Sequence, residues 1–393
     1  MAHSIFERKL RIGMVGGGPG AFIGAVHRKA FALDGQYELV AGAFSSDPKK
    51  SAQTGKELML DPKRVYGSFA EMAAVEKTLS PDMRIDAVSI VTPNNVHYPA
   101  AKAFLEAGIH VICDKPVCMS ASEAKKLKAV IQKSGKIFAL THNYTGYVMV
   151  KLARDLVRAG ELGKLLKIVV RYPQSWLVTA AEKSGSKQAE WRTDPKRSGA
   201  AGCMGDIGTH AENLAEYITG LRMIEICADL TTFVKGRKLD DNGDCLVRWE
   251  NGVKGILYAS QISVGKENTL GIEVHGEKAS LKWEQEYPDD LWLYRDGKPG
   301  ELWRRGNPYI AKHSPAAARL TRLPSGHPEA FLEAFANIYY NVAETIRHTE
   351  AKTKVPALAL DFPNISDGVR GMEFIEAVVK SSKLGAKWVK LPK

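Results

Sequence analysis

Cysteine is scarce in this sequence, and long apolar runs are missing. Five of the 393 residues are cysteines, an odd number with no C-x-x-C pair and no zinc-ligand spacing. These features exclude a disulfide-stabilised secreted domain and a zinc module, and we expect reduced thiols in a cytoplasmic protein. No run approaches the ~18 continuous apolar residues that a membrane span needs. The N-terminal segment carries charges in place of the apolar centre of a signal peptide, so none is expected.

No segment of the chain concentrates positive charge, although the net formal charge is +11. Lysine and arginine are spread along the chain without a long basic block. Nucleic-acid-binding proteins gather such residues into patches, so we expect no nucleic-acid partner. The excess suits a solvated surface and a site for an anionic cofactor. Internal repeats and low-complexity tracts are absent too, and the length predicts two domains.

Glycine is concentrated between an early strand and a helix. The apolar run 11–15 leads into a glycine-rich turn, 16–20, and a helical pattern covers 25–33. This order is the context of the dinucleotide-binding G-x-G-x-x-G turn, whose glycines let backbone N–H groups approach a pyrophosphate. Gly24 serves as the third glycine after an insertion of three residues. The residues predicted to contact a dinucleotide here are Gly16, Gly18, Gly20, Ala21, Phe22, Ile23 and Gly24.

The second predicted strand, 38–44, leaves the choice of dinucleotide open. An NAD site usually has an Asp or Glu at the end of this strand, where it accepts hydrogen bonds from the ribose. Here Ser45 and Ser46 take that place, with Asp47 just beyond. The carboxylate that would repel a 2′-phosphate is gone, and no arginine replaces it. We therefore expect NAD or NADP, with Ser45 and Ser46 near the ribose.

Strand and helix signals then alternate as in a doubly wound parallel sheet. The predicted strands are 87–91, 110–113 and 137–140, and the predicted helices are 98–107 and 121–134. Ligands bind at the carboxyl ends of such strands. Pro116 restricts Lys115 to an extended backbone, which aims the lysine side chain. The strand-end residues expected to face the cofactor are Thr92, Pro93, Asn94, His97, Asp114 and Lys115.

The second half of the chain is rich in strands. After a helix at 147–159 and a strand at 166–172, strands follow one another from 224 onward. We predict type I′ hairpin turns at Asn251-Gly252 and Asp296-Gly297. This pattern indicates an α+β domain with a large, open, mostly antiparallel sheet. Two further helices are predicted at 328–345 and 366–380. We expect a dinucleotide domain at 1–143 and a substrate and oligomerisation domain at 144–393. Helix 366–380 is expected to pack back near the first domain.

Apolar residues alternate along these strands beyond what covering helices would need. The positions concerned are Val247, Trp249, Leu257, Trp283 and Trp292. We therefore expect an uncovered face of the sheet and a homo-oligomer, a dimer or a tetramer, formed through that face.

A Gly/Ala-rich loop opens onto a predicted helix that carries Asp206 and His210. The two residues are four apart, so at a helix start both face the same direction. Histidine is suited to proton transfer near neutrality, and a nearby carboxylate fixes its orientation. A carboxylate in a first turn is also an ordinary helix cap, and a lone helical histidine is usually structural. Together with Lys115 at a strand end of a dinucleotide fold, the pair favours a catalytic site.

These motifs together resemble the Gfo/Idh/MocA family, named after glucose–fructose oxidoreductase, inositol dehydrogenase and rhizopine catabolism. The resemblance covers essentially the full chain. Its motifs are the glycine turn ending at 24–27, T-P-N-N-V-H at 92–97, D-K-P at 114–116, W-R at 191–192, G-x-x-x-D-x-x-x-H at 202–210 and D-G at 367–368. The chain departs from the family in the loop insertion, the serines after the second strand, Asp114 where Glu is more frequent, and Ala200-Ala201 in a usually glycine-rich loop.

The resemblance implies an NAD(P)-dependent dehydrogenase that acts on a ring hydroxyl of a sugar or cyclitol, without a metal. It implies that His210 is the general base, that Lys115 stabilises charge on the reacting oxygen, and that Asp206 orients the substrate. Further expected cofactor contacts are Asn143, Trp191 and Arg192. Expected substrate contacts are Lys115, Tyr144, Tyr172, Asp206, His210 and His327. The alternatives are a reductase of a keto-sugar or related carbonyl or imine, and a catalytically silent nucleotide-binding sensor. The ring substrate, the oxidised carbon and the direction stay open.

Overall fold

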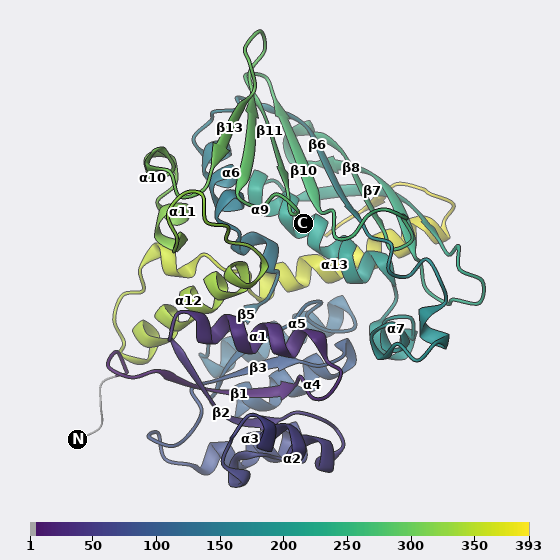
Figure 1. The fold of residues 1–393 in the computed structure, drawn as a ribbon. Helices are drawn as coiled ribbons and strands as arrows, with labels where there is room; N and C mark the ends of the chain where they lie inside the picture. Colours follow the sequence, from purple (N-terminus) through teal and green to yellow (C-terminus); the bar gives the residue numbers. More distant parts are fainter. Residues whose placement is uncertain (1–4, 393) are drawn as a thin grey trace. The chain divides into compact units, whose positions relative to one another are not determined.

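The computed structural model describes residues 5–392, which form two compact units (Figure 1). The first unit contains the chain up to His142 and again Phe335–Val369. The second contains Asn143–Ala334 and the chain from Arg370 onward. The expected domains, 1–143 and 144–393, stay a prediction, and the compact units differ from them mainly by residues 335–369. Within residues 5–392, no helix combines the length and the apolar character that crossing a membrane requires.

The first unit is built on a five-stranded parallel sheet in the order β2-β1-β3-β4-β5. Strands β3, β4 and β5 are wholly buried, as the continuous apolar runs predict for a sheet covered on both faces, whereas the edge strand β2 is partly exposed. The strands are β1 Leu10–Gly16, β2 Tyr37–Ala43, β3 Ala87–Val91, β4 His110–Cys113 and β5 Phe138–Leu140. The helices between them are α1 Phe22–Leu33, α2 Pro48–Glu57, α3 Phe69–Thr78, α4 Asn94–Glu106 and α5 Ala121–Ser134.

The strand order places α1 on the opposite face of this sheet from α3, α4 and α5. The crossover from β1 to β2 runs one way across the sheet, whereas the later crossovers run the other way. Because such crossovers are right-handed, the two sets of helices cover opposite faces. The reversal falls between β1 and β3, and ligands bind at the carboxyl ends of strands beside such a reversal. The glycine turn follows β1 at this position.

Short polar residues define the helix ends in this unit. Ser120 precedes α5, and its hydroxyl accepts a hydrogen bond from the N–H of Glu123 at 3.2 Å. Gly135 ends the same helix in the left-handed conformation, as a C-terminal glycine does. Two starts differ from expectation: α1 begins at Phe22 and α4 at Asn94, each a few residues earlier than predicted. Pro99 lies inside α4 rather than in its first turn.

The second unit contains a nine-stranded sheet in the order β13-β12-β11-β10-β6-β9-β8-β7-β14. All neighbouring strands are antiparallel except β6 and β9, which are parallel. The strands are β6 Leu165–Pro173, β7 Met223–Thr231, β8 Asn242–Trp249, β9 Lys254–Ser260, β10 Gly271–Gly276, β11 Ser280–Glu284, β12 Asp290–Tyr294, β13 Glu301–Arg304 and β14 Val389–Lys390. The predicted fold class, a parallel Rossmann sheet followed by a large mostly antiparallel sheet, is confirmed.

Two helices, α6 Val148–Arg158 and α9 Thr209–Thr219, pack against each other and against strands of this sheet. Shorter helices are α7 Lys187–Arg192, α8 Pro195–Ser198, α10 Pro308–His313 and α11 Pro315–Leu320. Two long helices, α12 Phe331–Glu350 and α13 Ile365–Lys383, each pass along the chain from one unit into the other. The long helix α12 therefore begins later than the predicted residue 328.

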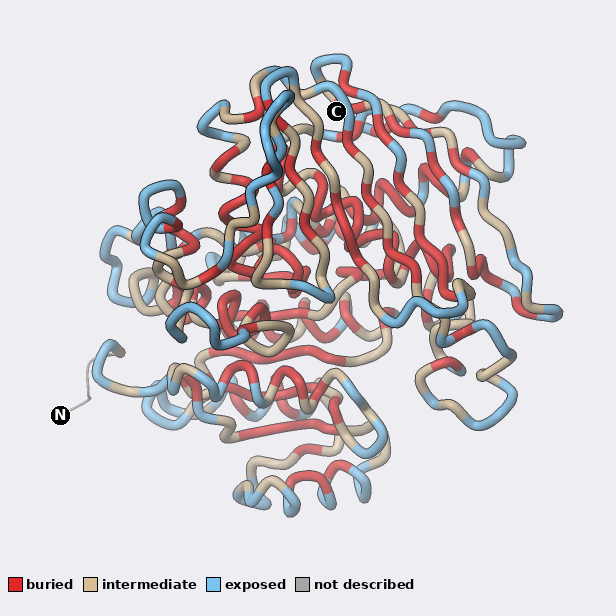
Figure 2. The backbone as a smooth tube through the Cα atoms, turned by 45° about the horizontal axis from the view of Figure 1, so that its top comes forward, coloured by how far each residue is buried: buried red, intermediate tan, exposed pale blue. Residues whose placement is uncertain are grey.

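Burial alternates along the strands of the second sheet (Figure 2) and corrects one expectation. Four of the apolar residues expected to lie on an uncovered face are buried: Val247, Trp249, Leu257 and Trp283. They lie on the covered face of the sheet, against which α9 packs at β6, β9 and β10 and α6 packs at β11 and β12. Trp292 is exposed, as are Leu246 and Ile256 on the opposite face.

One of the two predicted hairpin turns is confirmed and the other is wrong. Asn251 and Gly252 have φ of +59° and +77°, as a type I′ turn requires. At the second hairpin Gly297 has φ +66°, whereas Asp296 is not among the described non-glycine residues with positive φ. Asp296 and Gly297 are the central residues of a turn that the Lys298 N–H closes on the Arg295 carbonyl at 3.1 Å. This turn is not type I′, and it does not join the strands directly, because β12 ends at Tyr294 and β13 begins at Glu301.

Candidate active site

The glycine turn after β1 packs tightly against the start of α1. A Cβ on Gly24 would lie 2.4 Å from the Cα of Gly17, so only glycine lets the helix approach the turn this closely. The N–H of Gly18 donates to the carbonyl of Phe44 at 3.0 Å, which ties the turn to the end of β2. Gly24 thus has the close-packing place of the third glycine in a dinucleotide turn, with the insertion accommodated before it.

The start of α1 suits an anionic group. No carboxylate lies in its first turn, and Ala21 before it offers no side-chain cap. Helix N-terminal N–H groups bind phosphates. At the neighbouring strand end, the Thr92 hydroxyl is buried without a hydrogen-bond partner among the described residues. A buried hydroxyl needs a partner, so both observations fit a bound dinucleotide at this edge of the sheet.

The loop after β2 does not choose between NAD and NADP. Asp47 caps α2, where its carboxylate accepts from the N–H groups of Lys49 and Lys50 at 3.0 and 3.4 Å. The Ser45 hydroxyl accepts from the N–H of Asp47 at 3.1 Å, and Ser46 is exposed. The Asp47 carboxylate thus serves the helix, and the position of Ser45 and Ser46 near the ribose stays a prediction.

Hydrogen bonds fix the backbone of the loop after β4, which carries Lys115. One Asp114 carboxylate oxygen accepts from the Lys115 N–H at 2.8 Å and from the Thr141 hydroxyl at 3.1 Å. His97 of α4 contacts the carbonyls of Pro116 and Thr92 at 2.7 and 2.8 Å through its two ring nitrogens. His97 therefore fastens the β4 loop to the β3 loop, and burial lowers its pKa against the opposite effects of Asp114 and these carbonyls. This geometry supports a positioning role for His97, and its contact with the cofactor stays a prediction.

His142 lies beside Lys115 in the first unit, and the sequence analysis did not single it out. Burial, together with the positive charge of Lys115, lowers the pKa of His142 to about 3. The imidazole is therefore neutral at physiological pH. Its position directly after β5, at the same sheet edge as the other strand-end residues, is the signal that could have found it.

In the second unit, a π-helical turn, Met204–Gly208, precedes α9 and carries Asp206. This turn corrects the expectation of a simple helix start. The buried Asp240 carboxylate accepts from the N–H groups of Gly202 and Met204 at 2.7 and 2.8 Å, and so fixes the entry to the turn. A Cβ on Gly202 would lie 2.3 Å from the Asp240 carbonyl oxygen. π-helical turns occur often at functional sites.

One Asp206 carboxylate oxygen takes part in both a hydrogen bond and an ion pair. The Gln261 amide donates to Oδ2 at 2.8 Å, and the Arg192 Nε lies 3.3 Å from the same atom. The Arg192 guanidinium also lies over the Trp191 ring, 4.2 Å from its centroid. The structure thus brings the predicted residues Trp191, Arg192 and Asp206 together, with Gln261 as an addition that the sequence analysis missed.

His210, at the start of α9, is buried against two tyrosines. Its ring centroid lies 4.7 Å from that of Tyr144, edge to face, and 6.2 Å from that of Tyr172. The Tyr172 hydroxyl donates to Asn268 Oδ1 at 2.6 Å, and Asn268 Nδ2 donates to the Tyr144 hydroxyl at 3.3 Å. The Tyr144 hydroxyl therefore donates to that of Tyr172, with which it is in close contact. Burial raises the pKa of Tyr144 to about 12, so this closed ring is uncharged.

The other predicted residues of the second unit lie in different surroundings. Asn143 is buried directly before Tyr144. His327 lies on an exposed loop, and its carbonyl accepts from Arg305. Lys115 belongs to the first unit, whereas Asp206 and His210 belong to the second. The roles of all these residues stay predictions.

The sequence compares with known proteins over nearly all of its length. Residues 10–142 match the oxidoreductase family with an NAD-binding Rossmann fold, and residues 150–282 match the GFO/IDH/MocA C-terminal domain. The chain belongs to the GFO/IDH/MocA oxidoreductase family. The predictions of family, enzyme class and a nicotinamide dinucleotide cofactor are thereby confirmed, and the choice between NAD and NADP stays open.

Three relatives of this family member are informative. An oxidoreductase structure from Sinorhizobium meliloti is 47% identical with a TM-score of 0.87, covering 98% of this chain and all of that one. An inositol dehydrogenase homolog from Azotobacter vinelandii, complexed with NADH and myo-inositol, is 33% identical with a TM-score of 0.90 over 98% and 99% of the two chains. The uncharacterized oxidoreductase YfiI of Bacillus subtilis is 34% identical over 98% of both chains.

Proposed function

We propose that this GFO/IDH/MocA protein is a dehydrogenase that oxidises a ring hydroxyl of a cyclitol or a related sugar with NAD or NADP. The observation that carries the proposal is the placement, in the second unit, of Asp206 on a π-helical turn and of the buried His210 at the start of the helix that follows it. The Azotobacter homolog complexed with NADH and myo-inositol supports the choice of substrate class. Polar side chains beside His210 suit a ring that carries several hydroxyls.

The proposed roles follow from the ordinary chemistry of each side chain. Bound nicotinamide would accept the hydride of the substrate C–H bond. His210 takes the hydroxyl proton as the carbonyl forms, because imidazole exchanges protons near neutral pH. The Lys115 ammonium stabilises the negative charge that develops on the oxygen. Asp206 accepts a hydrogen bond from a substrate hydroxyl and so orients the ring. The tyrosine ring system keeps the His210 imidazole in one orientation.

The residues that would hold the dinucleotide are those at the strand ends of the first unit. The glycine turn and the start of α1 would take the pyrophosphate. Ser45 and Ser46 would lie at the ribose, and Thr92 would supply a hydroxyl near the nicotinamide half. Asn143, Trp191 and Arg192 would complete the cofactor contacts from the second unit.

A substrate screen tests the proposal directly. Purified protein is incubated with NAD or NADP and a panel of inositols, hexoses, anhydro-sugars and sugar acids, and formation of reduced nicotinamide is followed by absorbance. We expect turnover with at least one cyclitol or sugar. Turnover only in reverse, with a keto-sugar and reduced nicotinamide, would favour the reductase alternative. Tight dinucleotide binding without turnover in either direction would favour the silent sensor.

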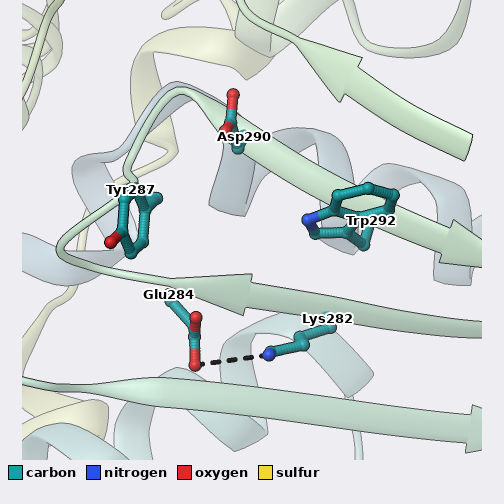
Figure 3. Close-up of a pocket in the computed structure, with 5 residues that line it drawn as sticks. All are labelled: Lys282, Glu284, Tyr287, Asp290 and Trp292. Atoms are coloured by element: carbon teal, nitrogen blue, oxygen red, sulfur yellow. Dashed lines mark ion pairs between the residues drawn. The ribbon is translucent and has the colours of Figure 1, made fainter.

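We further propose that the chain forms a homo-oligomer in the cytoplasm. The open face of the second sheet carries the exposed apolar residues Leu246, Ile256 and Trp292. On the same face, Lys282, Glu284, Tyr287, Asp290 and Trp292 line a cavity of about 230 Å³ (Figure 3). Exposed apolar patches are frequent protein–protein contact sites. Light scattering should give a mass of at least twice the 43.1 kDa of one chain, and a monomer would contradict the proposal.

A further inference from the structure

Gln261, at the end of β9, is held rigidly beside Asp206. The side chain is 2% exposed, its backbone N–H donates to the Asp241 carbonyl at 2.9 Å, and its own carbonyl accepts from the Leu177 N–H at 3.0 Å. Because both of these backbone groups are hydrogen-bonded, the backbone at Gln261 is held in place, and so is the point from which its side chain extends. Its amide nitrogen reaches Asp206 Oδ2 at 2.8 Å.

The chemistry of the two groups fixes the direction of this hydrogen bond. An ionised carboxylate only accepts, so the amide must present its NH₂ end to Asp206. Hydrogen bonds to a charged acceptor are shorter and stronger than neutral ones. The bond therefore favours the ionised form of Asp206 over the protonated form. The positive charge of Arg192, which lies near the same oxygen, also favours the ionised form of Asp206.

We propose that Gln261 is a positioning residue for the reaction: it orients the Asp206 carboxylate and keeps it ionised, so that Asp206 accepts a hydrogen bond from a substrate hydroxyl. This inference rests on the proposed role of Asp206. Gln261 itself acts through Asp206. A protonated or rotated Asp206 would instead present a donor to the substrate, or no group at all.

Other ionisable groups around Asp206 could also contribute to the pH dependence of activity. The Arg192 guanidinium forms an ion pair with the Asp206 carboxylate, and His210 follows Asp206 by four residues. The Asp206 charge contributes, after burial, to the raised pKa of Tyr144, Tyr172 and Cys203. These three groups stay neutral in the acid range. Burial raises the pKa of Asp240, which fixes the entry to the turn that carries Asp206, so the acid limb of activity reports on Asp206, His210 and Asp240.

The test compares Gln261→Leu and Gln261→Glu with wild type. Gln261→Leu removes the donor, and we expect kcat/KM to fall roughly tenfold, as for a lost hydrogen bond to a charged group. The acid limb of the pH profile should move upward by about one pH unit. Gln261→Glu places a second carboxylate against Asp206, so the upward shift should be larger, because two adjacent carboxylates do not both ionise readily.

A matched control is Gln53→Glu on α2. The Gln53 amide also donates to a carboxylate, that of Glu57, at 2.9 Å, but both side chains are exposed. The substitution creates the same kind of carboxylate pair outside the site, and we expect an unchanged pH profile. A merely structural role for Gln261 would lower the melting temperature without moving the acid limb.

A second readout does not depend on activity. The carboxyl carbon of Asp206 is followed by ¹³C NMR in aspartate-labelled protein and assigned with Asp206→Asn. Titration midpoints that rise in both Gln261 variants support the inference. Unchanged midpoints in both variants overturn it. If Asp206→Asn retains wild-type turnover, the proposed role of Asp206 fails, which is a separate result from the behaviour of Gln261.

Discussion

The two units hold their site residues by different kinds of contact. In the first unit, Lys115 is fixed through neighbours at strand ends: Asp114 bonds its N–H, and His97 bonds the carbonyl of Pro116. In the second unit, Asp206 is held by side chains of two other segments, Gln261 after β9 and Arg192 of α7. The first set of contacts comes from the sheet topology, whereas the second needs an assembled core of side chains.

This difference has a consequence for substitution. A parallel sheet places every strand end at one edge, so the first-unit residues keep their positions as long as the sheet forms. In the second unit each site residue depends on a side chain contributed by another strand or loop. We therefore expect the largest loss of turnover from a substitution at the second-unit site, and a loss of dinucleotide affinity from a substitution in the glycine turn of the first unit.

The largest effect is expected for His210→Ala. Loss of the proposed general base should lower kcat by about a hundredfold to ten-thousandfold. Dinucleotide affinity should remain within about twofold, because His210 is not among the residues proposed to contact the dinucleotide. Steady-state kinetics and fluorescence titration with reduced dinucleotide measure the two quantities on folded protein.

His275→Ala is the matched control for this prediction. His275 lies on β10 of the same unit, and its side chain is 38% exposed. Its replacement should leave kcat unchanged. A His210→Ala enzyme that turns over at the wild-type rate across the pH range would end the assignment of His210 as the base.

Lys115→Ala should change kcat less than His210→Ala does, but it should change KM as well. Removal of the ammonium should lower kcat and raise KM, each by roughly tenfold, because the charge serves both the developing oxyanion and the substrate hydroxyl. It should also raise the pKa of the neighbouring His142, which Lys115 now helps to lower. NMR of the imidazole detects that shift without substrate. The exposed Lys133→Ala variant is the control, and an unshifted His142 titration would contradict the predicted contact.

Much of the first unit could be predicted from sequence because its signals are local. Apolar runs, glycines and strand-end residues such as Thr92 and Lys115 are read directly, and the topology of a parallel sheet then gathers them. The same locality explains Gly24, whose place as third glycine follows from the turn and the helix beside it. His142 was missed although it directly follows a predicted strand.

The second unit was predicted less completely because its signals are non-local. Gln261 and Asn268 lie in segments that show no motif, and only the pairing of β6 with β9 and β10 brings their surroundings to α9. Which face of the sheet the helices cover was also undetermined, so Trp249 and Trp283 were placed on the wrong face. The alternation of apolar and polar residues along a strand divides them between the two faces of the sheet, but it does not say which face the helices cover.

Gly18→Val should weaken dinucleotide binding tenfold or more. A Cβ at this position would lie 2.6 Å from the Phe44 carbonyl oxygen, so the turn must move away from the end of β2. This substitution tests the difference between the two units, because it should lower cofactor affinity without altering Asp206 or His210 in the second unit. Calorimetric titration with NAD and NADP measures the loss. Gly371→Ala, where a Cβ meets no atom within 4 Å, is the control, and equal affinity in both variants would show that the turn is misplaced.

The smallest effect is expected away from the site, at Glu350 in the first unit. Its carboxylate lies 2.8 Å from His110 Nε2 and 2.6 Å from the Lys136 ammonium. The Ile137 N–H donates to His110 Nδ1, so His110 is a neutral donor through Nε2. The hydrogen bond from His110, aided by Lys136, lowers the pKa of Glu350 to about 2. A depressed carboxyl pKa contributes stability above the ordinary value of about 4.5 that is lost as the pH falls toward 2.

Glu350→Gln should therefore destabilise the protein near pH 7 and lose this effect toward pH 2. Because the Glu350 side chain is 36% exposed, solvent screens the interaction and the expected difference is about 1 kcal/mol or less. Denaturant midpoints of the two proteins at several pH values measure it. Glu106→Gln is the control: Glu106 pairs with Lys102 at 3.7 Å on the exposed surface of α4, and its loss should have a smaller effect at any pH. A difference that stays constant from pH 7 to pH 3 would show that the His110–Glu350–Lys136 cluster stabilises the first unit by packing rather than by charge.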